Sequence, residues 1–249
     1  MQTTNYQLKY HQTEYLTCFP QVIEVINYRA EYDGTVILPK KWVQTEEGRQ
    51  RKAQRMTFLD YLVCKAIQLL GGDFRGGVEG CRMLAQKLNS TVESIRKTLQ
   101  RLQQIQLNSY EPIPLLQKIE THTSKDFAER SGYQPQACKY RLSGWFIQEE
   151  ARHEAQYKAY VAGQSTYSAV QCVQYIPQVA QELGLSWKEY FLLFMHQVRY
   201  RDGRGCYNKS DWARATGVCR GLIYNVLDKF KSQNPVSYTH LTLPTILRV

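Results

Sequence analysis

The chain has 249 residues, which leaves room for about two domains of roughly 100 to 200 residues each. Its 32 lysine and arginine residues exceed its 22 aspartate and glutamate residues and give a formal net charge of +10, so we expect a polyanionic partner. The longest apolar run, Tyr190 to Met195, is far below the roughly 18 to 20 residues of a membrane span, and the polar start resembles no secretory signal. These features predict a cytoplasmic protein without membrane contact.

The cysteines and glycines indicate no enzyme. The 7 cysteines are scattered and form no Cys-x-x-Cys pair, so we expect reduced core thiols and no metal site. The alternative is a site built from His196, Cys206 and Cys219. Gly72 to Gly77 has the glycine spacing of a phosphate-binding loop, but the Lys and Ser or Thr that must follow are absent. We therefore predict no catalytic residues and no cofactor.

The first 56 residues contain signals for a β-hairpin and a basic arm. Val22 to Tyr32 and Thr35 to Leu38 are joined by Asp33-Gly34, a turn that favours paired strands. A basic stretch then precedes the first predicted helix, and we interpret it either as a phosphate-contacting arm or as a solvated linker: Arg49, Arg51, Lys52 and Arg55.

A repeat with a shift of 128 residues relates two basic parts of the chain. After Thr57, apolar residues at helical spacing predict a first helix, and a shift of 128 finds large apolar residues again after Ser186, which forms a capping box with Glu189. Both helices lead into glycine-rich loops. The paired positions are Leu59, Leu62, Val63, Ala66, Ile67 and Leu70, and Trp187, Tyr190, Phe191, Phe194, Met195 and Val198.

Each copy continues with two further helices. Leu84, Ala85, Leu88, Asn89, Ile95 and Leu99 correspond to Trp212, Ala213, Thr216, Gly217, Ile223 and Leu227. A small residue, a turn residue four positions later and an apolar residue six beyond it resemble the helix-turn-helix of DNA-binding proteins. Asn89 replaces the turn glycine, because Asn tolerates a left-handed backbone. Two generic amphipathic hairpins are the alternative.

The resemblance implies that the second helix of each pair enters the major groove of DNA. In the first copy this helix is predicted from Thr91 to Ile105, with Ser90 and Glu93 as a capping box. A solvated helix face is the alternative to DNA contact, and Arg96 and Lys97 are the stronger candidates. The full set of outward candidates is Thr91, Ser94, Arg96, Lys97, Gln100 and Arg101.

In the second copy Ile223 and Val226 are predicted to face inward. Arg220 and Asn225 suit bidentate contacts with guanine and adenine. The other DNA-binding candidates are Tyr224 and Lys229 on the same helix, and Arg199, Arg201 and Arg204 in the loop before it.

Two strands, Leu115 to Glu120 and Cys138 to Phe146, follow the first helix pair. Lys139 and Arg141 should share one strand face, toward DNA, with Tyr140 and Leu142 on the other. A plain edge strand protected by its lysine is the alternative. The order of helices and strands resembles a winged helix.

Together these patterns predict a mainly α protein with small β-wings (α+β), in which a winged helix over residues 57–148 and a second over 186–234 flank an acidic helical connector over 149–185. Residues 235–249 resemble a translated sequencing-adapter tail. The arrangement resembles tandem winged-helix replication initiators of plasmids and phages, which implies sequence-specific binding of double-stranded DNA. The alternatives are a transcription regulator and a helical protein-interaction adaptor. A homodimer or the replication or transcription machinery are the other expected partners.

Overall fold

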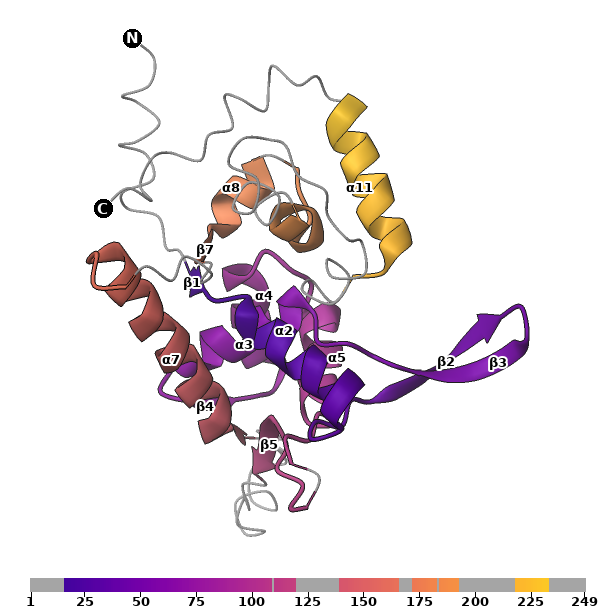
Figure 1. The fold of residues 1–249 in the computed structure, drawn as a ribbon, viewed down its shortest axis with the longest axis horizontal. Helices are drawn as coiled ribbons and strands as arrows, with labels where there is room; N and C mark the ends of the chain where they lie inside the picture. Colours follow the sequence, from indigo (N-terminus) through magenta and orange to yellow (C-terminus); the bar gives the residue numbers. More distant parts are fainter. Residues whose placement is uncertain are drawn as a thin grey trace, which may run out of the picture.

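The computed structural model describes residues 16–108, 110–119, 139–165, 172–182, 184–192 and 218–232. Helices and three small antiparallel sheets make up this part of the chain, in agreement with the predicted α+β class (Figure 1). Among the described helices, none combines the length and the apolarity that a membrane span requires. Four of the cysteines in the described ranges are buried and one is exposed, and all five are unbridged thiols.

The helices and strands follow one another in a simple order. Residues 187–192 are also helical. The elements are β1 (Leu16–Cys18), α2 (Gln21–Tyr28), η1 (Arg29–Asp33), β2 (Lys40–Thr45), β3 (Gly48–Ala53), α3 (Phe58–Leu69), β4 (Asp73–Arg75), α4 (Val78–Lys87), α5 (Val92–Leu102), β5 (Leu116–Ile119), β6 (Lys139–Leu142), α7 (Gly144–Val161), β7 (Val173–Tyr175), α8 (Pro177–Glu182) and α11 (Arg220–Ser232).

The predicted hairpin over residues 22–38 is wrong, because residues 21–33 are helical. Val22, Ile23 and Ile26 are fully buried, and their spacing follows the helical period better than the alternation of a strand. Gly34 has φ 66 and ends the helical segment, so the Asp-Gly signal marks a helix end here. The hairpin of this region is β2–β3, which lies later in the chain and contains Arg49, Arg51 and Lys52.

One apolar core joins both ends of the described chain around α3. Every residue of α3 from Phe58 to Ile67 is buried, whereas Leu70, predicted on the same stripe, is 48% exposed just beyond the helix end. The ring of Phe58 stacks on Phe191 at 3.8 Å between centroids and meets Tyr175 edge-on at 5.8 Å. The residues predicted as a connector therefore contribute directly to the core.

The predicted connector is only partly helical. α7 ends before Gly163, as expected, but the second predicted helical stretch is wrong at residues 173–175, which form β7 and pair with β1. Val173 and Tyr175 are buried on either side of a half-buried residue, the alternation of a strand. Pro177 begins α8, where its missing N–H leaves no hydrogen bond unmade.

A three-stranded sheet in the order β4-β6-β5 closes the body around α3, α4 and α5. β4 lies in the glycine-rich loop where the sequence analysis expected no strand. Gly71 has φ 88 and ends α3 with its N–H bonded to the carbonyl of Gln68, which lets the chain turn into β4.

The two copies of the repeat agree where both are described. Thr57 and Asp60 form a capping box at α3, and Ser186 and Glu189 form the predicted one 129 residues later. α5 and α11 begin at Val92 and Arg220, a shift of 128. The counterparts of α4, with Trp212, Ala213, Thr216 and Gly217, lie outside the described residues, as does the tail over 235–249.

Candidate nucleic-acid interface

The turn between α4 and α5 has the geometry that the sequence predicted. Asn89 has φ 47, and it is the one non-glycine residue with positive φ in the described ranges. The N–H of Ser90 bonds to the carbonyl of Ala85 at 2.9 Å, and the N–H of Asn89 bonds to that of Gln86 at 3.3 Å. This pair of bonds is a Schellman motif, so it ends α4 and sets the start of α5.

Two tyrosines of the predicted connector region support this turn from below. The hydroxyl of Tyr175 donates to the carbonyl of Leu88 at 2.8 Å, and the hydroxyl of Tyr190 donates to the carbonyl of Gln174 at 2.9 Å. Burial raises the pKa of both phenols, so they stay protonated donors at neutral pH. The position of the turn is therefore fixed by hydrogen bonds from β7 and from the helix over residues 187–192.

α5 begins one residue later than predicted. Thr91 is the N-cap, and its hydroxyl accepts from the N–H of Ser94 at 3.1 Å. The predicted capping box of Ser90 and Glu93 is therefore wrong. Glu93 instead forms an exposed ion pair with Lys97 at 3.2 Å, one helical turn away. Thr91 and Ser94 are thus partly engaged in capping.

The two faces of α5 differ sharply. Ile95, Leu99 and Leu102 have at most 2% of their surface exposed, and the predicted stripe is confirmed. On the opposite side Arg96, Lys97 and Gln100 are exposed. Arg96 also lies beside the Cys81 thiol of α4, whose pKa is raised by burial and lowered by the nearby guanidinium.

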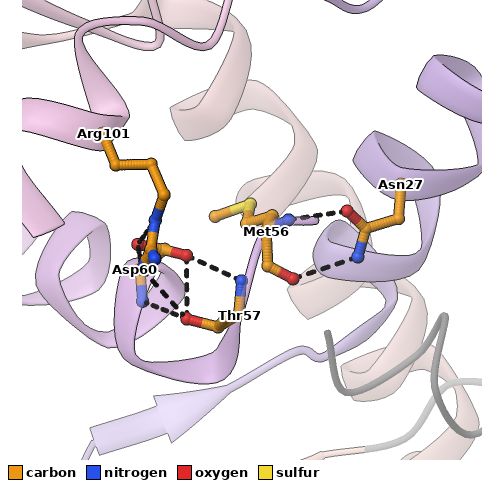
Figure 2. A network of polar contacts seen from close by, with 5 residues as sticks. All are labelled: Asn27, Met56, Thr57, Asp60 and Arg101. Atoms are coloured by element: carbon orange, nitrogen blue, oxygen red, sulfur yellow. Dashed lines mark hydrogen bonds and ion pairs between the residues drawn. The ribbon is translucent and has the colours of Figure 1, made fainter. Parts of the chain in front are cut away.

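Arg101 is the exception among the α5 candidates. Its guanidinium binds the fully buried carboxylate of Asp60 through two nitrogens, one at 2.9 Å, and reaches the hydroxyl of Thr57 at 3.4 Å (Figure 2). Asp60 also caps α3 through the N–H of Thr57 at 2.7 Å. Arg101 therefore joins the end of α5 to the start of α3, and its charge is neutralised within the fold.

A second polar contact holds the same corner. The side chain of Asn27 donates to the carbonyl of Met56 at 3.0 Å and accepts from its N–H at 2.7 Å, next to the capping box in Figure 2. Asn27 is 1% exposed, so this bidentate pairing satisfies a buried amide. It ties α2 to the segment that begins α3.

Lys139 and Arg141 share one face of β6, as predicted. Both bind Asp73 of the neighbouring β4, at 2.7 Å and 3.1 Å, and they hold the pKa of that carboxyl below its ordinary value. Tyr140 packs against the core and Leu142 is buried on the other face. These two cations carry a net charge of about +1 once Asp73 is counted.

α11 presents most of the predicted second set on its surface. Arg220, Tyr224 and Asn225 are exposed, whereas Ile223 and Val226 are buried as expected. The side chain of Lys229 and the loop residues Arg199, Arg201 and Arg204 lie outside the described residues.

The ribbon β2–β3 adds basic residues that the candidate set did not include. Lys40 and Lys41 are exposed on β2. Arg49, Arg51 and Lys52 are exposed on β3, while Arg55 pairs with Glu31 of η1 at 2.9 Å. The alternating pattern from Lys40 to Ala53 around Glu46-Glu47 was the signal for this hairpin, but an acidic dipeptide is not a typical turn sequence.

A buried polar network between α3 and α7 was also not predicted. Glu150 accepts hydrogen bonds from Tyr61 and Lys65, and Tyr61 in turn accepts from the N–H of Phe19 at 2.7 Å. Burial raises the pKa of Glu150, while Lys65 opposes that shift. No group of acidic, histidine and cysteine side chains suited to a metal ion occurs in the described part of the chain. The network is a structural link within the body.

Comparisons with protein-family models, with curated proteins and with solved structures give no significant match for this chain.

Proposed function

We propose that residues 57–142 form a winged-helix unit that binds double-stranded DNA through the exposed face of α5. The order α3, β4, α4, α5, β5 and β6, with the three strands in one antiparallel sheet, supports this assignment. The observation that carries the proposal is the division of α5 into a fully buried apolar face and an exposed face with Arg96, Lys97 and Gln100. β5 and β6 are the strands of the wing.

The exposed side chains suit the chemistry of a DNA groove. Arginine and glutamine make bidentate contacts with guanine and adenine edges, and lysine binds phosphate. α5 has 11 residues, which at about 1.5 Å per residue is about 16 Å, enough to cross a major groove about 12 Å wide. We assign base contacts to Arg96 and Gln100, phosphate contact to Lys97 with Thr91 and Ser94 at the helix start, and a structural role to Arg101.

α11 is proposed as a second DNA-reading helix. It begins 128 residues after α5, and it exposes Arg220 and Asn225 opposite buried Ile223 and Val226. Two such helices in one chain would read two segments of one site. The proposed role is replication initiation of a plasmid, phage or other mobile element, without catalysis, and regulation of transcription is the related role for the same surface.

The test compares two variants of the full chain that lose the same charge. Arg96→Gln/Lys97→Gln removes two cations from α5, and Arg152→Gln/Lys158→Gln removes two from exposed ion pairs on α7. Binding to a random duplex of about 30 base pairs is measured by fluorescence anisotropy, because the phosphate contacts are independent of sequence.

We expect the α5 variant to bind about tenfold or more weakly, and the α7 variant to bind like the wild type. Equal affinities for all three proteins would contradict the assignment of α5. A wild-type chain that binds no duplex would contradict DNA binding altogether and favour a protein-interaction adaptor.

A further inference from the structure

The ribbon β2–β3 projects from the body and has no buried face (Figure 1). β2 pairs with β3 in one antiparallel register from Lys40 opposite Ala53 to Thr45 opposite Gly48. Six residues at about 3.3 Å each give it a length of about 20 Å. A two-stranded ribbon of this kind gains little from packing, so its sequence is not explained by the core.

One face of the ribbon concentrates arginine around an exposed tryptophan. Trp42, Arg51 and Arg49 lie on the same side, because Arg51 is directly opposite Trp42 and Arg49 is two residues along its strand. Both guanidinium carbons lie over the indole ring, at 5.7 Å for Arg51 and 5.9 Å for Arg49, although the ring is 59% exposed. The stacking holds two charges side by side at the surface.

The other face places like charges opposite each other. Lys41 faces Lys52 across the ribbon, an arrangement that destabilises a strand pair. Within the described residues, neither lysine has an acidic partner. From residue 40 to residue 53 the ribbon has five basic and two acidic side chains. A polyanion bound along the ribbon would remove the repulsion between the two lysines.

The base of the ribbon is fixed to the end of α5. Ile37 exchanges two backbone hydrogen bonds with Gln106, at 2.9 Å and 3.0 Å, shortly after α5 ends. The N–H of Gln54 bonds to the carbonyl of Pro39 at 2.7 Å and closes the base. The ribbon therefore leaves the body beside the helix that we assign to the major groove.

We propose that the ribbon binds the phosphate backbone of duplex DNA beside the segment contacted by α5. This inference rests on the proposed function and adds a second, separate contact to it. The acidic tip, Glu46 and Glu47, favours contact along the flanks of the ribbon over insertion of its tip. The net positive charge also opposes pairing of the ribbon with that of a second copy of the chain.

The test uses the full chain and the salt dependence of its binding to a random duplex of about 30 base pairs. Lys41→Gln/Lys52→Gln removes two cations from the ribbon, and Arg152→Gln/Lys158→Gln on α7 is the charge-matched control. We expect the slope of log affinity against log salt to become shallower by about 0.9 for each lost phosphate contact in the ribbon variant, and to stay unchanged in the control.

Lys52→Glu separates binding from folding of the ribbon. An acidic side chain opposite Lys41 turns repulsion into attraction, so the thermal midpoint should stay equal or rise while affinity for duplex falls by about tenfold or more. A purely structural role would move both quantities in the same direction, and that result would overturn the inference.

The remaining outcomes separate this inference from the proposed function. A ribbon variant that binds duplex like the control, while Arg96→Gln/Lys97→Gln is weakened, would overturn the ribbon contact alone. Weakened ribbon variants with a normal α5 variant would support the ribbon and overturn the assignment of α5. Loss of binding to a single strand of equal length but not to duplex, or loss of a dimer in sedimentation, would overturn the choice of duplex as partner.

Discussion

α5 and the ribbon β2–β3 are both rich in cations, yet the fold uses those cations in different ways. In α5, Arg101 is bound to buried Asp60, and Lys97 is paired with Glu93 at the surface. In the ribbon, Arg49 and Arg51 stack on Trp42, and Lys41 faces Lys52. Basic residues of similar appearance in the sequence therefore divide into one that stabilises the body and several that do not.

This difference separates two measurable quantities. Replacing a cation that neutralises a buried acid should lower the free energy of unfolding, because the acid is left without a partner. Replacing an exposed cation should leave stability nearly unchanged and alter only binding to a polyanion. The predictions below test this separation in the body and begin with the largest change.

Arg101→Met should lower the free energy of unfolding by about 3 to 5 kcal/mol, because fully buried Asp60 loses its counter-charge. Lys97→Met on the exposed face of the same helix should change it by less than about 0.5 kcal/mol. Urea unfolding followed by circular dichroism measures both values. If the two variants are equally stable, the structural role of Arg101 is wrong.

Gly80→Ala should destabilise the body by about 1 to 3 kcal/mol, although alanine normally favours a helix. An added Cβ would meet the carbonyl oxygen of Arg75 and would lie 2.9 Å from the ring of Phe74. Gly221→Ala in α11 meets no atom within 4 Å and is the matched control, which should not be destabilised. Thermal unfolding that ranks the two variants in the opposite order would refute the close packing of α4 on β4.

Asn89→Ala should cost about 1 kcal/mol, because alanine is strained at the φ of 47 that the turn before α5 requires. Asn89→Gly should be neutral or slightly stabilising, since glycine adopts this conformation without strain. Denaturant midpoints of the two variants check the sign. A more stable alanine variant would show that the turn is not left-handed.

Lowering the pH below about 6.5 should weaken the body through His153 of α7. Burial, followed by the charge of Arg152, lowers the pKa of this histidine, while Glu149 opposes the shift. The unfolded chain therefore takes up the proton first, so stability present above the unfolded pKa is lost as pH falls toward the folded pKa.

His153→Phe removes the proton-binding group from the same position. We expect its free energy of unfolding to decline less than that of the wild type between about pH 7 and pH 5.5. Parallel pH profiles for the two proteins would exclude His153 as the cause. The measurement does not involve the ribbon, so it tests the body alone.

The sequence predicted those features of the fold that depend on local backbone chemistry. The turn at Asn89, the caps at Thr57 and Ser186 and the buried stripe of α5 follow from short-range rules, and all are present. The helix over residues 21–33 was missed because the Asp33-Gly34 signal for a hairpin outweighed the helical spacing of Val22, Ile23 and Ile26.

The partners of charged side chains could not be predicted from local patterns. Arg101 meets Asp60 across 41 residues and Tyr61 meets Glu150 across 89, so tertiary packing alone decides that these groups are internal. The position of the ribbon relative to α5 depends in the same way on the pairing of Ile37 with Gln106. The DNA contacts of α5, α11 and β6 stay predictions until binding is measured.

The most direct test of the account is the salt dependence of wild-type binding to a random duplex. Each phosphate neutralised by Arg96, Lys97, the ribbon or α11 should add about −0.9 to the slope of log affinity against log salt, so affinity should fall steeply between low and physiological salt. Retention that stays flat over this range would contradict duplex DNA as the partner of this protein.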